Sequence, residues 1–573
     1  MMSLAFILPL ASVVLCLGLD RFVASRLIGL GAAATLLLGA VLLIIGRLTQ
    51  ALPLIVVESV WLEWDAISWR IALVIDPLGW STALIAYSGG ALGLLGSALA
   101  LPPNLRGFGG LFAALLLALV GAAAGACSPT LPVLTFAPMI VSIAWFVALR
   151  TSGALPGSDA PLVLVVAGSV AALTLLAVIL LARAGASDVS PILIVAGVLA
   201  SVWVLCGLPP AHAPLAAAHL APAALSVMAP LGLPLIGIVA LLRLLPDYLA
   251  SPGQAGGSAL MIVGILAFVI AAARAVWLNS LRQIGAAQLS AQAALIVVCA
   301  GCGSEAFRAV APALAVHALI STLALGLGVA ALERRSGSDD VTSLSRHPES
   351  ALYVTTSGIV LAASSIVGIP GTWGFWSRFW LFDAVQQSAP WAIPLMLTGS
   401  SLLALAMVAP LVRFWHASAP STSLRRAHPG ELLPFGVAAL LVVMGIIPGA
   451  ARRLVSVAPS DSMLYLPDLA GTIASVGAAL LLIVAPVVLR RLRERRAPPP
   501  DERLASVLTP DTIGTALSGL AWLAAPALPE TFHAGLAHIA LRIRQGLAVL
   551  GRRYYLAAVL FALIVVILVF AAV

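Results

Sequence analysis

Long apolar runs recur along nearly the whole chain and are separated by short polar or proline-rich segments. Runs of about 18 or more nearly uncharged residues are typical of transmembrane helices. The pattern predicts an all-α polytopic membrane protein with about 16 transmembrane helices. The expected spans are 3–19, 26–46, 74–100, 107–127, 129–149, 161–183, 190–209, 221–245, 257–278, 284–303, 307–333, 351–369, 374–416, 431–449, 469–489 and 554–573.

Two segments do not fit the pattern of a span. Residues 50–73 alternate apolar and polar positions and contain several tryptophans, which predicts an extended hairpin at the outer membrane interface. Residues 501–553 carry arginines along one side of an amphipathic pattern. We expect them to form a lateral helix on the inner surface, before the last transmembrane helix at 554–573.

Two spans are expected to be broken. Residues 209–220 hold His212 and His219 among prolines, and the run 374–416 contains Pro390. Unpaired backbone groups are costly at membrane depth and persist where they are buried in protein or line a cavity. We therefore predict interrupted helices at both places, whereas a plain loop is the simpler alternative for 209–220.

Composition supports the prediction of a membrane protein and limits which side chains could carry protons. Hydrophobic residues make up 62% of the chain and charged residues 9%. The net charge of +8 comes from arginine, because the chain contains no lysine. Arginine stays charged at any reachable pH, whereas a buried lysine shifts its pKa and exchanges its proton. Lysine is therefore excluded as a proton carrier here.

The placement of arginine predicts the topology. If the N-terminus lies outside, most loop arginines face the cytoplasm, as is usual for membrane proteins. This arrangement explains the basic charge without a nucleic-acid partner. The N-terminal apolar run lacks a cleavage signal and is expected to be the first span. We expect a multi-pass protein of a bacterial or archaeal inner (plasma) membrane.

The sequence predicts no cofactor, no metal site and no catalytic residue. All five cysteines lie in or beside apolar spans. Cys299 and Cys302 are two residues apart, but no second pair completes a metal site. The chain also lacks a glycine-rich nucleotide fingerprint after a strand.

A set of short motifs carries a resemblance to a known family. They are Ile75–Asp76–Pro77–Leu78; Pro210, His212, Ala218, His219, Ala221, Pro222, Ser226, Gly237 and Arg243; His317–Ala318; and Gly368, Pro370, Gly374 and Phe375. In this order the chain resembles antiporter-like subunits of respiratory complex I, of membrane-bound hydrogenases and of multisubunit Na+/H+ antiporters. Its layout is most similar to the distal subunit with a lateral helix.

The resemblance implies a domain layout. N-terminal transmembrane helices occupy 1–128, and two inverted five-helix repeats with broken helices follow at 129–278 and 279–450. A C-terminal helix and an arginine-rich linker then fill 451–500.

The resemblance also implies a mid-membrane proton path of one glutamate and several lysines, which exchange protons when buried. This chain departs from it. The glutamate position is Ala137, and lysine positions are Leu205, Leu235 and Ser321; Arg282 and Arg378 stand at two more. The remaining candidates for a proton path or polar axis are His212, His219, His317, Arg243, Arg274, Arg282, Arg378 and Asp76.

Several functions fit these observations. The resemblance favours a membrane-arm subunit of an NADH-quinone oxidoreductase or hydrogenase type ion-translocating complex, with its Glu/Lys path largely lost. Its partners are then other membrane-arm subunits and the lipid bilayer, and any electron transfer belongs to those subunits. One alternative is a non-conducting scaffold or anchor for a peripheral partner, as in an inorganic carbon uptake complex. Another is a free-standing cation/proton antiporter.

Overall fold

The computed structural model describes residues 2–49, 52–64, 67–153, 160–183, 191–249, 255–341, 353–417 and 429–455. The chain divides into two compact units, Met1–Val487 and Val488–Val573. The second unit lies outside the described residues, as do the expected span 469–489, the lateral helix and the last transmembrane helix. All described residues belong to the first unit.

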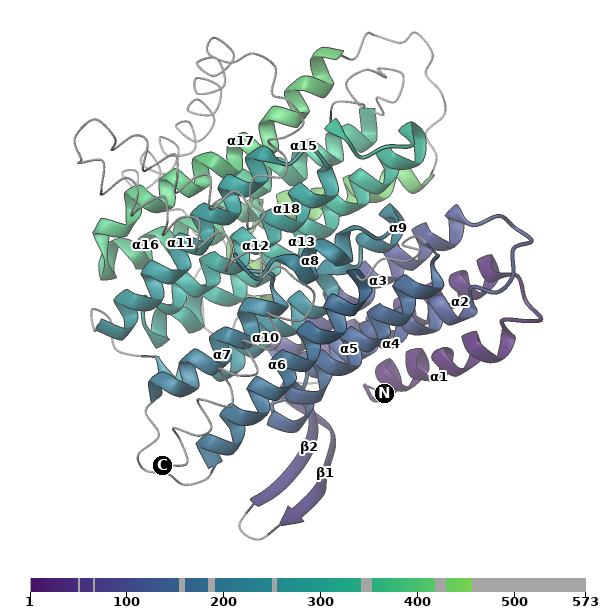
Figure 1. Cartoon of the computed structure of the whole chain (residues 1–573), viewed down its shortest axis with the longest axis horizontal. Helices are drawn as coiled ribbons and strands as arrows, with labels where there is room; N and C mark the ends of the chain where they lie inside the picture. Colours follow the sequence, from purple (N-terminus) through teal and green to yellow (C-terminus); the bar gives the residue numbers. More distant parts are fainter. Residues whose placement is uncertain are drawn as a thin grey trace, which may run out of the picture. The chain divides into compact units, whose positions relative to one another are not determined.

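The N-terminal part is a set of helices that pack against their neighbours in sequence (Figure 1). The third helix, α3, begins where sequence chemistry predicts a start. Asp76 accepts a hydrogen bond from the Gly79 N–H at 2.7 Å, and Pro77 occupies the first helical position. Both are preferred at a helix N-terminus. The helices are α1 (Leu4–Leu19), α2 (Ser25–Thr49), α3 (Pro77–Ala100), α4 (Gly109–Ala126), α5 (Leu131–Thr151) and α6 (Ala160–Arg183).

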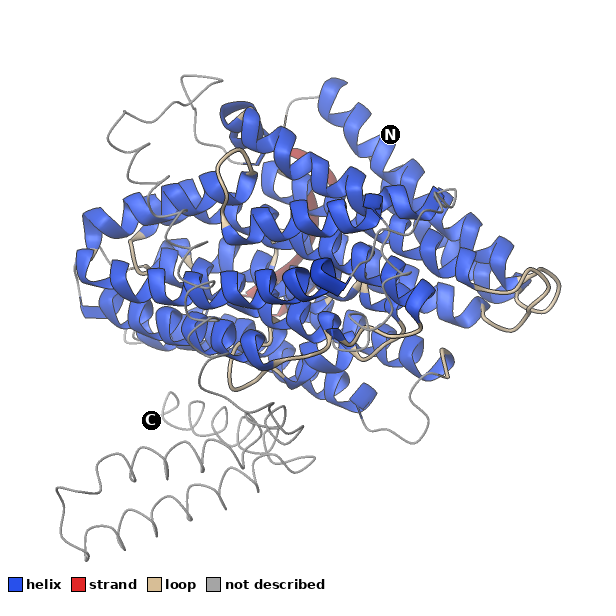
Figure 2. Ribbon diagram, turned by 90° about the horizontal axis from the view of Figure 1, so that it is seen from above, coloured by secondary structure: helices blue, strands red, loops and turns tan. Residues whose placement is uncertain are grey.

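A β-hairpin separates α2 from α3. Strand β1 (Leu54–Trp64) pairs antiparallel with β2 (Ile67–Ile75), and irregularities in register lie at Ile55/Val57 and Val60/Leu62. In Figure 1 the hairpin projects beyond the ends of the helices. Figure 2 shows it as the single sheet among the described helices. The hairpin predicted for 50–73 is present, and its location at the outer membrane interface stays a prediction.

The first predicted helix break is also confirmed. Helix α7 ends at Leu205, and only short helical pieces follow before α10 begins at Leu233. Gly207 makes the turn after α7 with φ +61, a conformation that favours glycine. The pieces are α7 (Pro191–Leu205), α8 (Ala213–His219), α9 (Ala223–Ser226), η1 (Ala229–Leu231), α10 (Leu233–Leu244) and η2 (Pro246–Tyr248).

The second half is built around α13, which packs against α12, α15, α16 and α18. The break expected near Pro390 is confirmed, since α16 ends at Ser388 and a short 3-10 turn precedes α17. The elements are α11 (Ala255–Trp277), α12 (Leu281–Ala300), α13 (Ser304–Ser336), α15 (Tyr353–Val367), α16 (Trp373–Ser388), η4 (Pro390–Ala392), α17 (Ile393–Ala417), α18 (Pro429–Ile446) and α19 (Pro448–Val455).

The described part of the chain is that of a polytopic membrane protein. Ten of its helices are long and apolar enough to cross a membrane, and four shorter ones are also apolar. Large apolar side chains stay exposed on α1 and α2, including Val14, Leu27 and Leu48, as expected of surfaces that face lipid or other membrane helices. The all-α polytopic fold is thus confirmed, and the inverted-repeat boundaries stay predictions.

Candidate polar axis

Polar side chains of α12 satisfy the backbone groups that the first helix break sets free. The Ser290 hydroxyl donates to the carbonyls of Cys206, at 3.2 Å, and of Gly207. The Gln283 amide donates to the Ala216 carbonyl at 3.2 Å. The Cys206 and Gly207 carbonyls follow the end of α7, and an unpaired carbonyl at membrane depth is costly. The Ala216 carbonyl also accepts from the Leu220 N–H at 3.1 Å. The break is therefore held open by protein groups.

The two histidines of this break take different roles. His219 is buried, and its Nδ1 lies 2.9 Å from the Leu215 carbonyl, one turn earlier in α8. His212 precedes α8, and its Nδ1 has no hydrogen-bond partner among the described residues. Arg274 lies in the last turn of α11. A carboxylate does not join this group within the described residues.

Arg282 belongs to a charged cluster at the start of α12. Its guanidinium lies 3.1 Å from Asp339 and 3.4 Å from Glu333, and it donates to the Ala221 carbonyl. The Ser280 hydroxyl also donates to Asp339. Burial raises the pKa of the Asp339 carboxyl, but the hydrogen bonds from Arg282 and Ser280 outweigh burial and hold that pKa below its ordinary value. The cluster ties the helix break to the end of α13.

Asp76 and Arg243 join α3 to the end of α10. The Arg243 guanidinium donates to both carboxylate oxygens, at 2.8 and 3.0 Å, and to the Ala126 carbonyl at 2.7 and 3.2 Å. A bidentate pair of this kind fixes geometry as well as charge. Every carboxylate oxygen of Asp76 is thereby engaged, because Oδ1 also caps α3.

A neutral cluster occupies one lysine position of the family pattern. Ser321 on α13 accepts hydrogen bonds from Gln288 at 3.4 Å and from Gln292 at 3.3 Å. Thr322 donates to the Gln288 oxygen at 2.9 Å. All four side chains are buried. The cluster contains no group that titrates near neutral pH, so it orders α12 against α13 without holding a charge.

His317 lies one turn before Ser321 and faces α15 and α16. Its Nε2 is 3.1 Å from the Ser365 hydroxyl oxygen, which also accepts from the Gly374 N–H at 3.2 Å. Its Nδ1 is buried without a hydrogen-bond partner among the described residues. A side chain at position 374 would collide with this group, because a Cβ there lies 1.8 Å from the Ser365 carbonyl oxygen. Glycine is required for this close approach.

Arg378 is a buried cation held by helix carbonyls. It is 4% exposed and donates to Val367, at 2.7 Å, and to Ile366. These are the last carbonyls of α15, which lack helical partners and carry the negative end of the helix dipole. Its Nε lacks a partner among the described residues, and no described carboxylate pairs with it. Arg378 therefore acts as a C-terminal cap of α15.

The remaining family positions are apolar and tightly packed. Ala137, Leu205 and Leu235 are all buried. A Cβ placed on Gly125 would lie 2.8 Å from the Ala137 side chain, and one on Gly237 would lie 2.9 Å from that of Leu205. Close helix contact thus occupies the space that charged side chains would need.

The cavity beside Leu205 is too small and too apolar to hold a water chain. Its volume is about 10 Å³, and its lining is Trp145, Leu164, Leu205, Pro214, Leu215, Ala218, Ala229, Leu233 and Pro234. A single buried water needs about 10–15 Å³ and two to four polar partners. This cavity therefore has room for at most about one water.

Sequence reasoning missed Ser365 and Asp339, which bind His317 and Arg282. For each of these two residues, the sequence contains only a weak signal of a functional role. Ser365 precedes the glycine-rich turn before α16, and Asp339 follows the last turn of α13. Neither signal identifies the residue that is bound, because His317 and Ser365 are 48 positions apart in sequence and Arg282 and Asp339 are 57 apart.

The apolar helices, the two helix breaks and the buried polar groups around α12 and α13 describe a polytopic membrane protein. Residues 160–404 match the family model described as NADH:quinone oxidoreductase/Mrp antiporter, TM. Within this segment the chain is similar to the antiporter-like membrane proteins of that family.

A solved structure supports the same fold. A chain of the Mrp complex from Dietzia sp. DQ12-45-1b matches with a TM-score of 0.70 and 19% sequence identity. The match covers 92% of this chain and 63% of that chain, so this protein corresponds to less than two thirds of that relative. No curated protein sequence matches the chain.

Proposed function

We propose that the chain is an antiporter-like subunit of a multi-subunit membrane complex and that it does not carry protons along a Glu/Lys path. The observation that carries this proposal is the packing at Leu205. A leucine in close contact with Gly237, beside an apolar cavity of about 10 Å³, occupies the position of the first expected lysine. A dry apolar segment is a barrier to protons.

The polar residues that remain support a structural role. Asp76 with Arg243, Arg282 with Asp339, and Arg378 with the end of α15 each join separate helices. Their charges are engaged in fixed contacts and are not open to exchange with a passing ion. The subunit then serves as a scaffold within its complex or as a membrane anchor for a peripheral partner, such as that of an inorganic carbon uptake system.

The type of complex is a further part of the proposal. The family match and the Mrp fold likeness are compatible with an NADH-quinone oxidoreductase, a hydrogenase or a multisubunit antiporter. The exposed apolar faces of α1 and α2 offer contact surfaces for other membrane subunits. Isolation of the native complex and identification of its subunits by mass spectrometry would decide between these types and a free-standing antiporter.

One observation favours a second candidate, proton transfer through histidine. His317 is buried on α13 with an unpartnered Nδ1, and the hydroxyl and amide groups of Ser365, Ser321 and Gln288 lie on the same and neighbouring helices. Histidine exchanges protons in the physiological range. Among the described residues, the hydrogen-bond partner of His317 is the Ser365 hydroxyl and not a carboxylate that would drive this exchange.

The test compares proton flux in two preparations. In proteoliposomes, the purified subunit should leave an imposed pH gradient intact. In the native complex, His317→Ala should leave the pumping stoichiometry unchanged where assembly is complete. A lower stoichiometry in a fully assembled His317→Ala complex would establish conduction through histidine and would refute the scaffold proposal.

A further inference from the structure

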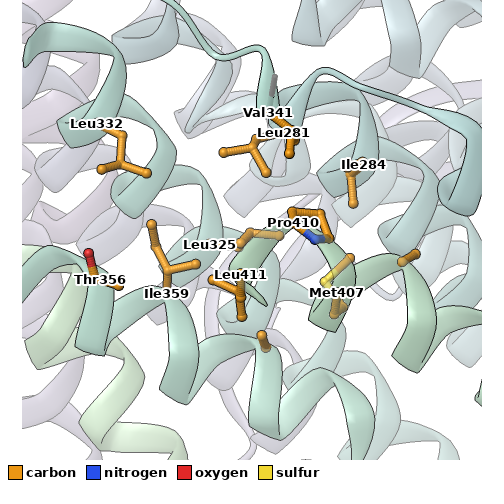
Figure 3. Close-up of a pocket in the computed structure, with 12 residues that line it drawn as sticks. Leu281, Ile284, Leu325, Leu332, Val341, Thr356, Ile359, Met407, Pro410 and Leu411 are labelled. Atoms are coloured by element: carbon orange, nitrogen blue, oxygen red, sulfur yellow. The ribbon is translucent and has the colours of Figure 1, made fainter. Parts of the chain in front are cut away.

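An apolar pocket lies between α12, α13, α15 and α17 (Figure 3). Its lining consists of Leu281, Ile284, Leu325, Leu332, Val341, Thr356, Ile359, Ala363, Ala406, Met407, Pro410 and Leu411. Eleven of these twelve side chains are apolar. An accessible volume of about 30 Å³ is two to three times what one water needs. The pocket therefore suits a thin chain and excludes a fused ring system.

Thr356 supplies the one hydroxyl of this lining (Figure 3). Its side chain is 7% exposed, and its Oγ1 has no hydrogen-bond partner among the described residues. A buried hydroxyl without a partner costs about 1–3 kcal/mol. An occupant with a single hydrogen-bond acceptor beside an apolar chain would remove that cost.

The pocket lies near one end of its helices. It is bounded by the first turn of α12, the last turns of α13, residues 356–363 of α15 and the second half of α17. Leu281, Leu332 and Val341 adjoin the charged cluster of Arg282, Glu333 and Asp339. Charged clusters at the ends of membrane helices mark the interface with lipid headgroups. From Leu325 to Leu332 the pocket follows α13 for about 10 Å.

We propose that this pocket binds one acyl chain of an ester-linked phospholipid. The chain lies along Leu325, Ile359 and Met407, and its ester carbonyl accepts a hydrogen bond from the Thr356 hydroxyl. The headgroup then lies at the level of Arg282 and Glu333, where charges of both signs match a zwitterion. The narrow pocket, the single unpartnered donor and the adjacent charged layer together select this occupant.

Photo-crosslinking of the full-length protein in proteoliposomes tests the proposal. The probe is a phosphatidylethanolamine with a diazirine in one acyl chain, prepared in ester-linked and ether-linked forms, and adducts are located by mass spectrometry. Val360 on α15 is 36% exposed and is the reference for general contact with lipid. Adducts on Ile359 or Met407, at a level at least equal to that on Val360, are expected from the ester-linked probe.

Two variants separate the pocket from general lipid contact. Ala363→Leu fills the pocket and should lower the Met407 adduct about five-fold relative to the Val360 adduct, whereas the matched control Val360→Leu should leave the Met407 adduct unchanged. The wild-type protein should prefer the ester-linked probe over the ether-linked probe about five-fold, the value expected for one hydrogen bond. Thr356→Val should abolish this preference.

Other outcomes overturn the proposal. Adducts confined to outward residues such as Val360 in the wild-type protein, which requires no variant to fold, would show that no lipid chain enters. Crosslinks from Met407 to a peptide would assign the pocket to a protein segment. Equal labelling by the two probes in the wild-type protein would refute the role of Thr356.

Discussion

Asp76 and Arg243 are 167 residues apart in sequence and form a two-oxygen ion pair at 2.8 and 3.0 Å. Asp76 also caps α3, and Arg243 also binds the last turn of α4 through Ala126. One contact thus fixes three helix ends. The side chains are 29% and 12% exposed, so water screens the pair only in part.

This pair leads to a prediction about stability. Arg243→Lys keeps the charge but loses the bidentate geometry and the bond to Ala126, because an ammonium cannot reproduce the guanidinium fork. We expect a loss of about 2 kcal/mol in the free energy of unfolding, measured by thermal unfolding of the detergent-purified protein. The control is Arg47→Lys, at the end of α2. An equal effect of both variants would contradict the role of the pair.

A second prediction concerns the close contact at Gly374. Gly374→Ala places a Cβ 2.6 Å from His317 Nε2 and even closer to the Ser365 backbone. We expect destabilisation by about 1–3 kcal/mol or more, as for other overpacked sites. Gly436→Ala on α18 is the matched control, since nothing lies within 4 Å of its added Cβ. That change should be neutral or stabilising.

A third prediction concerns the lost proton path. Ala137→Glu together with Leu205→Lys should not create proton flux, because the surroundings no longer solvate either charge. Each charge at this depth costs about 3 kcal/mol or more, so poor folding is expected in size-exclusion chromatography. Leu205→Met conserves volume and should fold normally. Proton flux into proteoliposomes that contain the folded double variant would contradict the proposal.

A fourth prediction concerns acid stability. The pKa of Asp339 is lower in the folded protein than its ordinary value of 3.8, so its contribution to stability is present above that value. This contribution is lost as the pH falls through the lower, folded-state pKa. Asp339→Asn should therefore lower stability at pH 7 by about 2 kcal/mol and reduce the steepness of the acid-induced loss below pH 3.8. Parallel pH profiles for both proteins would contradict this assignment.

Much of the fold follows from the sequence, because a hydrophobic run of membrane length has few alternatives to forming a transmembrane helix. The expected span 307–333 appears as the helix Ser304–Ser336, and 107–127 as Gly109–Ala126. Proline placement gave the break near Pro390. The hairpin followed from alternation in 50–73.

The contacts of the polar residues did not follow from the sequence. The sequence singled out His212 and His219 at the first break, but it is Ser290 on α12 that binds the freed carbonyls of Cys206 and Gly207. Such pairs depend on which helix packs beside the break, and local sequence carries no information about that. The capping role of Arg378 could not be predicted either, because it depends on where the end of α15 lies in the folded protein.

The cap that Arg378 provides has a consequence for ion selectivity. A guanidinium that never loses its proton and never leaves its carbonyl partners is a permanent source of positive potential inside the second half of the protein. With an effective dielectric constant of about 20, a monovalent cation that passes at about 10 Å meets a repulsion of about 2 kcal/mol. Sodium or potassium ions moving beside α13 would therefore encounter an electrostatic barrier that no conformational gate has to supply.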